Sequence, residues 1–406
     1  MKSLIVTFIC FMLFTSIAEA YTAYYYYGQY FKITSPNTVE LIKPIKADGN
    51  MTLKKEYNGN FIIQDIIPID NKAYFVTKIA DSAFDESKIT SLTIGEYIDS
   101  IGESACANCK FLKMFNSNAK LTYIGSRAFE GCSNLSNIIL PNGLKYIGDR
   151  AFSNCLLSDE LSIPSSVTSI GICSFFGTNI HTLSLSSQKL SIGEYAFAQA
   201  NKLEVINIAS LTNWCNYKFE TIYSNPLYYA RVLTLNGEPI VDLDLTSEQI
   251  ISIPEGAFLR QTSIKKVKLG ATLKTISSKS FYTSSIISIN ILAEIPPKIE
   301  KDSFTHSTYA NAILTVPFGC VQVYKNSSFW SSFSNIVEAE DKSSNVDTNI
   351  FKESIHINNR NISASKPVFM KIYTIDGKCL YNDVTDSYTF ESPGIYIVNG
   401  SKYNIM

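Results

Sequence analysis

The sequence predicts a mainly β protein in which a parallel β solenoid with a cap at each end is followed by a small β-sandwich tail. Three observations support this prediction. A phrase of the form Ile-Gly-x-x-Ala-Phe recurs at steps of 22 or 23 residues, and a fixed period in this range is typical of solenoids. Each copy then carries two apolar residues separated by one other residue, which is the alternation of a short strand. The repeat stops after residue 338, and simple alternation of apolar and polar residues begins after residue 349.

An aromatic residue anchors almost every copy of the repeat. Apolar residues follow the anchor at positions six, nine and eleven, so each copy should form one short strand. The step widens to 61 residues between Phe197 and Phe258, which indicates an insertion, placed at residues 209–250. We expect the glycine after each isoleucine to permit a turn that a side chain would block. The anchors are Phe84, Phe129, Phe152, Phe175, Phe197, Phe258, Phe281 and Phe304, with Cys106 in the same slot of one copy.

The two ends of the repeat region differ from its middle. Residues 21–75 are irregular and rich in aromatic residues, as expected of a cap that covers the open end of a solenoid core. The solenoid is predicted over residues 76–338, with a second cap at 316–338. Residues 339–349 are polar and without pattern, which is typical of a linker. Residues 350–406 alternate with turn signals between them, as a small β-sandwich does.

The first 20 residues have the pattern of a signal peptide. Lys2 precedes an apolar run over residues 4–14, and Ala18-Glu19-Ala20 has the form of a cleavage site. The run is too short to span a membrane, and no later stretch stays apolar for the about 18 residues that a spanning helix needs. We therefore predict an exported chain without a transmembrane helix.

Eight cysteines remain once the predicted signal peptide is removed. An even number in an exported protein is compatible with disulfides, but the repeat favours free thiols. Cys109, Cys132 and Cys155 each follow an anchor slot by three positions. They should stack on adjacent coils as small buried groups, and parallel side chains have poor bridging geometry. Cys106 and Cys109 have a C-x-x-C spacing, yet no second pair accompanies them, so zinc is not favoured.

Composition and motifs argue against several classes of function. The 35 basic and 36 acidic residues give a net charge of −1, which offers no attraction for nucleic acid or an anionic membrane. The histidines His181, His306 and His356 lie in different coils or domains, and none has a metal-ligand spacing. Asp242 and Asp244 are more typical of a solvated strand face than of a calcium site. We predict no enzyme activity, no cofactor and no metal.

The repeat resembles the BspA-like leucine-rich repeat proteins over residues 30–340. The resemblance implies a leucine-rich-repeat solenoid, right-handed as the crossover rule also favours, in a bacterial cell-surface or secreted protein. Some members of that family are implicated in adhesion to host proteins or other cells. The matching segments are residues 124–132, 140–141 and 147–152, the insertion segments 214–215, 225–227 and 235–237, and the closing segment 316–319.

The tail resembles a second family, the C-terminal sorting domains of Bacteroidetes type IX secretion. The matching segments are residues 372–377 and 392–398. This resemblance implies passage across the outer membrane and attachment to the cell surface.

Two surfaces are candidate binding sites. One is the row of residues that point outward from the predicted strands, because small polar groups in a row can hydrogen-bond an extended ligand, although such residues are also typical of an ordinary β surface. The row holds one charge, so binding should depend weakly on salt. The other is the run Tyr24, Tyr25, Tyr26 and Tyr27, which suits protein or sugar contact if exposed and otherwise packs in the cap. The row comprises Thr93, Asn116, Ile139, Ser162, Ser184, Asn207, Lys268, Asn290 and Thr315.

These observations lead to two hypotheses about function. The first is an exported, non-enzymatic surface protein that binds host or microbial macromolecules through one solenoid face. The alternative is a glycan-binding accessory protein of a carbohydrate-uptake system. Exposed tryptophan platforms would favour the alternative, but we expect both Trp214 and Trp330 to be structural.

Overall fold

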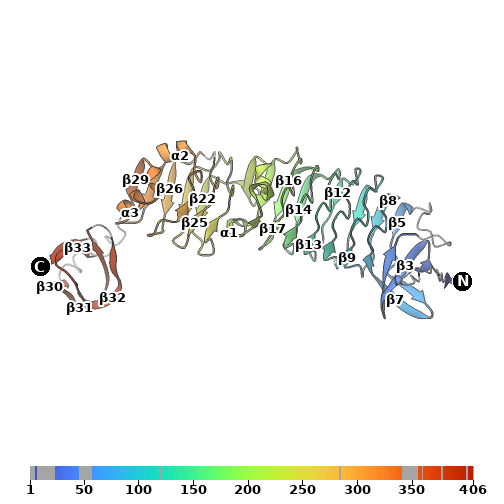
Figure 1. Cartoon of the computed structure of the whole chain (residues 1–406), viewed down its shortest axis with the longest axis horizontal. Coiled ribbons are helices and arrows are strands. Elements are labelled where there is room, and N and C mark those ends of the chain that lie inside the picture. The colour runs from blue at the N-terminus through green and yellow to red at the C-terminus, as the bar shows by residue number, and fades with distance from the viewer. Residues whose placement is uncertain are drawn as a thin grey trace, which may run out of the picture. The chain divides into compact units, whose positions relative to one another are not determined.

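A computed structural model divides the chain into two compact units, which we describe separately (Figure 1). The first comprises Met1–Ile240, Ile253–Ser263 and Ser277–Thr283, and the second the remaining segments from Val241 onward. Most of the predicted signal peptide and of the predicted linker lies outside the described residues. The structure describes residues 5–6, 23–44, 57–118, 120–282, 285–340, 355–358, 360–375, 378–398 and 401–405.

The first unit begins with antiparallel strands and then becomes a parallel solenoid. Strands β1 to β4 pair in antiparallel order, and β4 pairs in parallel with β7, which also pairs with β6 in antiparallel order. Strand β5 pairs in parallel with β8 of the first regular coil. The strands are β1 (Ile5–Val6), β2 (Ala23–Tyr26), β3 (Gln29–Ser35), β4 (Thr38–Ile42), β5 (Asn58–Ile62), β6 (Ile66–Ile69) and β7 (Lys72–Ile79).

Each coil of the first unit then contributes one strand to each of two sides. On one side, very short strands that contain the isoleucine before the glycine continue the sheet of β7 in parallel. Figure 1 shows β9, β13 and β17 along this side, and β8, β12, β14 and β16 along the other. The short strands are β9 (Ser100–Ile101), β11 (Tyr123–Ile124), β13 (Tyr146–Ile147), β15 (Ser169–Ile170), β17 (Ser191–Ile192) and β19 (Lys218–Phe219).

The other side carries the strands expected from the alternating apolar residues. They form two sheets, β12-β10-β8-β5 and β14-β16-β18-β20-β21, with no ladder between β12 and β14. The mainly β solenoid predicted from the period is therefore confirmed. The strands are β8 (Lys88–Thr93), β10 (Met114–Asn116), β12 (Asn137–Ile138), β14 (Ser158–Ile163), β16 (Asn179–Leu185), β18 (Val205–Ile208), β20 (Val232–Leu235) and β21 (Glu238–Pro239).

The anchor aromatics stack into a column inside the coils. The rings of Phe129, Phe152, Phe175 and Phe197 lie almost parallel, with centroids 5.2–5.4 Å apart. All four are buried. This spacing is close to the distance between neighbouring strands of a sheet, so one residue per coil fills the core continuously.

The glycines that follow the strand isoleucines are needed for a different reason from the one that we expected. The glycines after the isoleucines do not have positive φ angles. Instead, a Cβ on Gly125 would lie 2.7 Å from the carbonyl carbon of Gly102 in the preceding coil. Glycine is required because two backbones approach closely, and the turn is not the reason.

The turns around the anchors from Phe84 to Phe281 are made by other residues, which adopt left-handed backbone angles. They stand two positions before and two positions after the anchor, and most are not glycine, which is an uncommon conformation for such residues. The earlier position is occupied by Ser82, Ser104, Arg127, Arg150, Cys173, Tyr195, Gly256 and Lys279, and the later by Glu86, Asn108, Gly131, Asn154, Gly177, Gln199 and Arg260.

The cysteine column has the arrangement expected from its spacing. Cys109, Cys132 and Cys155 are buried free thiols. The Sγ of each donates to the backbone carbonyl of the anchor slot in the preceding coil, at 3.0–3.1 Å. The thiols therefore satisfy inward-facing carbonyl groups as well as filling space.

The insertion is fastened to the next coil of the same unit. The indole N–H of buried Trp214 donates to the carbonyl of Ala257 at 2.9 Å, and the Asn225 amide donates to the carbonyl of Gly256 at 3.0 Å. These bonds hold two short 3₁₀ turns against the solenoid. The helical elements are α1 (Leu211–Cys215), η1 (Ile222–Ser224) and η2 (Pro226–Tyr228).

The second unit contains a further parallel sheet, and helical segments precede the last strand of that sheet. The sheet β22-β24-β26-β28-β29 is parallel, and β25 pairs with β27. Tyr324 donates to the carbonyl of Ala293, and Trp330 to that of Pro297, each at 2.7 Å. The elements are β22 (Asp242–Leu245), β23 (Ser252–Ile253, at the unit boundary), β24 (Lys266–Leu269), β25 (Thr275–Ile276), β26 (Ser288–Ile291), β27 (Lys298–Ile299), α2 (His306–Asn311), β28 (Ile313–Val316), α3 (Val321–Lys325), η3 (Trp330–Ser332) and β29 (Asn335–Glu338).

The described strands of the tail are antiparallel around a small apolar cluster. They belong to one hydrogen-bonded sheet through the long strand β31, so a two-layer sandwich is only weakly supported. The strands are β30 (Ile355–Asn358), β31 (Asn361–Thr374), β32 (Cys379–Thr389), β33 (Gly394–Val398) and β34 (Ser401–Ile405). The buried cluster comprises Ile362, Met370, Ile372, Phe390, Tyr396, Val398 and Ile405. In the described part of the chain, no helix is long and apolar enough to cross a membrane.

Replacement of Phe152 by alanine should lower the free energy of unfolding by about 3–5 kcal/mol, because the buried ring leaves a cavity between two stacked neighbours. Urea unfolding measures the effect. Phe111→Ala is the matched control, since that ring is 52% exposed. An equal loss in both variants would contradict the stacked-core arrangement.

Replacement of Gly125 by alanine should cost about 1–3 kcal/mol by forcing the backbones of two coils apart. Thermal unfolding measures the change. Ser277→Ala is the control, because position 277 also follows a strand isoleucine but already carries a Cβ. A neutral Gly125→Ala would show that the coils are not this close.

Native-state alkylation should label Cys379 rapidly and leave Cys132, Cys155 and Cys215 unmodified until urea is added. Cys379 is exposed, the others are buried, and burial raises the pKa of the Cys215 thiol to about 12. The thiolate is the reactive form. Mass spectrometry after iodoacetamide treatment gives the order, and equal native labelling of Cys132 and Cys379 would contradict it.

Candidate ligand-binding face

The structure places the nine outward residues in three groups. Thr93, Asn116 and Ile139 follow the sheet of β8, β10 and β12, with Thr93 directly beside Asn116. Ser162, Ser184 and Asn207 lie in register on β14, β16 and β18. Lys268, Asn290 and Thr315 lie in register on β24, β26 and β28 of the second unit.

Neighbouring polar residues of the first unit bond to one another. The Asn116 amide donates to Thr93 Oγ1 at 3.1 Å, and Asn207 Nδ2 donates to Ser184 Oγ at 3.5 Å. Ser184 Oγ in turn donates to Glu160 Oε1 at 2.7 Å. Part of the hydrogen-bonding capacity that we assigned to a ligand is therefore used between coils.

Asn207 has a further structural role that its position in the sequence does not reveal. Its Oδ1 accepts from Thr234 Oγ1 at 3.1 Å and from the backbone N–H of Gly237 at 2.8 Å. Thr234 lies in register with Asn207 on β20. Thr234 thus continues the row, and we missed it because the insertion separates it from the regular period.

Exposed aliphatic side chains accompany the polar row on β5, on β10 and directly after β12. Ile139 is 77% exposed, Ile62 is 63% exposed and Met114 is 53% exposed. Ile62 pairs with Thr93, so it lies in the same row as Asn116. We name Ile62, Met114 and Ile139 the aliphatic patch. Ile62 was overlooked because we assigned its segment to the cap.

The row in the second unit is more charged than expected. Lys268 Nζ lies 3.8 Å from Asp244 Oδ2, and Lys266 Nζ lies 3.8 Å from Asp242 Oδ2. Bonds from Thr246, together with Lys268, lower the pKa of Asp244. These aspartates therefore pair with lysines on a strand face. Among the described residues, no group of three or more His, Cys, Asp or Glu could hold a metal ion.

The tyrosine run divides between two environments. Tyr25 and Tyr27 are 46% and 69% exposed, whereas Tyr24 and Tyr26 are half-buried. Tyr25 packs against Tyr30 at 5.0 Å, and Tyr26 against Tyr27 at 4.6 Å. The run is thus neither a fully packed cap nor a fully open platform.

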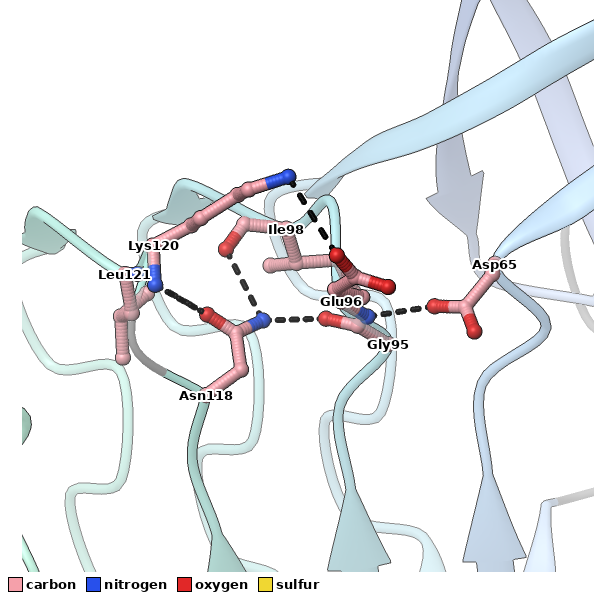
Figure 2. Close-up of polar contacts among 7 residues, drawn as sticks. All are labelled: Asp65, Gly95, Glu96, Ile98, Asn118, Lys120 and Leu121. Atoms are coloured by element: carbon pink, nitrogen blue, oxygen red, sulfur yellow. Dashed lines mark hydrogen bonds and ion pairs between the residues drawn. The ribbon is translucent and has the colours of Figure 1, made fainter.

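Turns beside the strand face are tied together by Asn118, as Figure 2 shows. Its Oδ1 accepts from the backbone N–H groups of Lys120 and Leu121 at 2.7 and 3.0 Å, and its Nδ2 donates to the carbonyl of Gly95 in the preceding coil. Lys120 pairs with Glu96 at 3.7 Å. These polar groups fix the spacing of the coils, so they are not free to define a ligand site.

The repeat region matches one known protein family. Residues 64–156, 122–226 and 236–358 match a family model described as a BspA type leucine rich repeat region with 6 copies. A comparison with curated proteins gives no match.

Solved structures with similar folds come from several bacteria, all at low identity. A leucine rich cell surface protein from Faecalibacterium prausnitzii A2-165 is 19% identical, with 79% of this chain and 96% of that chain covered and a TM-score of 0.36. A leucine-rich repeat protein from Bacteroides ovatus ATCC 8483 is 17% identical, with 77% and 98% covered and a TM-score of 0.33. The pneumococcal vaccine antigen PcpA is 17% identical, with 79% and 99% covered and a TM-score of 0.34.

Proposed function

The chain belongs to the BspA-type leucine-rich repeat family, and on that premise we propose that it is an exported surface protein that binds a host or microbial protein through the strand face of its first unit. The aliphatic patch carries this proposal. Large solvent-exposed apolar side chains beside polar ones resemble the apolar core and polar rim of a protein interface. Ile62 on β5, Met114 on β10 and Ile139 directly after β12 have this arrangement along one parallel sheet, in which β8 lies between β5 and β10.

The rigidity of the face supports the same proposal. The strands are paired in parallel, and the hydrogen bond between Asn116 and Thr93 holds neighbouring side chains in place. A preformed surface loses little conformational entropy when it binds. The polar side chains of the row already bond partly to one another, so fewer hydrogen-bonding groups remain for the hydroxyl groups of a sugar. This favours a protein ligand that is recognised by its shape and apolar area.

The proposal extends to the location of the protein. Residues 1–20 would direct export, and residues 350–406 would act as a sorting domain that attaches the protein to the extracellular face of the outer membrane. The net charge of −1 supports a protein partner over nucleic acid. No catalytic role is included in this proposal.

The alternative, a glycan-binding accessory protein of a carbohydrate-uptake system, gains no support from the tryptophans. Trp214 and Trp330 are both buried, and each donates its indole N–H to a backbone carbonyl. Neither can act as a stacking platform. A sugar would therefore have to stack on tyrosine rings, and the aliphatic patch on the strand face of the first unit contains no tyrosine.

Binding to an array of host matrix proteins and bacterial surface proteins should be weakened at least about tenfold by Ile139→Arg, because a charge at the centre of an apolar contact is left unpaired. The purified full chain serves as reference in biolayer interferometry. Since the aliphatic patch is uncharged, affinity should change little between about 50 and 500 mM salt.

Ile172→Arg is the matched control for this experiment. Ile172 is 44% exposed but lies in a turn of the first unit, away from the strand face. Equal thermal unfolding of both variants shows that folding is intact. An equal loss of binding in both, or no protein ligand at all, would count against the proposed face.

A further inference from the structure

A second surface of the first unit gathers tyrosine side chains around the insertion. The rings of Tyr195 and Tyr223 are stacked, with centroids 5.4 Å apart and planes 27° apart. Tyr223 meets Tyr228 edge-on at 5.0 Å, and Tyr228 meets Tyr229 edge-on at 5.2 Å. Tyr195 and Tyr223 remain 40% and 38% exposed. We name Tyr195, Tyr223, Tyr228 and Tyr229 the tyrosine cluster.

The cluster stands on a rigid support. Thr221 caps the turn η1 by accepting from the backbone N–H of Tyr223 at 3.2 Å, and Asn225 caps η2 by accepting from that of Leu227 at 2.9 Å. The hydroxyl of Tyr229 donates to the carbonyl of Tyr223 at 3.1 Å. The rings are therefore held in position before any ligand arrives, which lowers the entropic cost of binding.

The fold does not require a tyrosine at position 195. This is one of the left-handed turn positions, with φ of 58°. Other coils place Ser104, Arg127 or Cys173 there, and glycine or asparagine would adopt this conformation with less strain. The backbone therefore disfavours the tyrosine, and its side chain needs another explanation.

Polar groups of both charges border the rings. The carboxylate of Glu220 accepts from the backbone N–H of Glu194 at 3.3 Å, and that of Glu194 accepts from Thr221 Oγ1 at 3.4 Å. The guanidinium of Arg260 lies 5.8 Å from the ring centroid of Tyr228. It donates one bond, at 3.5 Å, to the Tyr228 carbonyl, which leaves most of its five N–H groups for other partners.

We propose that the tyrosine cluster, with Glu194, Glu220 and Arg260 at its border, binds a neutral oligosaccharide. A sugar ring presents C–H groups on its faces and hydroxyl groups at its edge. Tyrosine rings supply rigid amphipathic area for the faces. Carboxylates accept from sugar hydroxyls and a guanidinium donates to them.

The sign of the border charges favours a neutral ligand over a charged one. Two carboxylates lie near Tyr195 and Thr221 and one guanidinium lies near Tyr228, so neither a polyanion nor a polycation meets charges of a single sign. The negative charge of Glu194 is the main cause of the raised pKa of Tyr195. This site differs from the aliphatic patch, because it follows β17 and β19 in the other sheet.

Titration of the purified full chain with neutral oligosaccharides of glucose, mannose, galactose and xylose tests the proposal. At least one should bind, with an affinity that changes less than about twofold between about 50 and 500 mM salt. Tyr195→Asn should weaken it roughly tenfold or more by removing one ring of the platform. Asparagine tolerates the left-handed backbone, so this variant should fold as well as the wild type.

Two further variants separate this site from other surfaces. Tyr223→Ala should weaken binding in the same way. Tyr123→Ala is the matched control and should leave it unchanged, because Tyr123 is also exposed and stacked, on Tyr146 at 4.9 Å, but lies on β11, three strands before β17 in the same sheet.

Three results would overturn the proposal. One is the absence of binding to every oligosaccharide. Another is binding that Tyr195→Asn leaves intact while Tyr123→Ala or Ile139→Arg abolishes it. The third is steeply salt-dependent binding of oligoarginine or oligoglutamate peptides at the cluster without any sugar binding. None of these bears on protein binding by the aliphatic patch, which Ile139→Arg tests separately.

Discussion

The close approach of successive coils is the constraint on which the rest of this structure depends. Stacked phenylalanines lie 5.2–5.4 Å apart, near the spacing of hydrogen-bonded strands. At that distance there is no room for a Cβ where Gly125 faces Gly102. The same distance lets the thiol of Cys132 reach the carbonyl of Cys106. Aromatic, glycine and cysteine columns are therefore three consequences of one repeat distance.

This constraint also determines what the outer surface can offer. Side chains at the same position of adjacent coils are within hydrogen-bonding distance, so Asn116 bonds to Thr93 and Asn207 to Ser184. A row of small polar residues consequently satisfies part of its own capacity. Side chains that cannot pair in this way, such as Ile139, stay exposed, and for this reason we propose the aliphatic patch as the binding face.

The insertion interrupts the regular stacking of coils at one place and adds a surface with different side chains. Buried Trp214 and Asn225 fasten it to the following coil, which allows tyrosines on short turns to meet Tyr195 of the regular repeat. An aliphatic patch on one sheet and a tyrosine cluster beside the other differ in chemistry. The two proposals for protein and sugar binding therefore stand on separate observations and separate parts of the first unit.

The sequence alone determined the repeat, its core and one strand of each coil, whereas the second, very short strand of each coil was not predicted. The period places the same residue type at the same height in every coil, so the burial of Phe152 and the column of Cys109, Cys132 and Cys155 followed from spacing. The outward direction of Ser162 followed from alternation, since neighbouring residues of a strand face opposite sides.

Only the tertiary structure decided the features that depend on contacts between coils or across the insertion. The reason for Gly125, the pairing of Lys268 with Asp244, and the exposure of Ile62 beside Thr93 all depend on distances between segments far apart in the chain. The meeting of Tyr195 with Tyr223 is of the same kind. A periodic pattern specifies what repeats within a coil, whereas an irregular insertion has no period from which its position could be inferred.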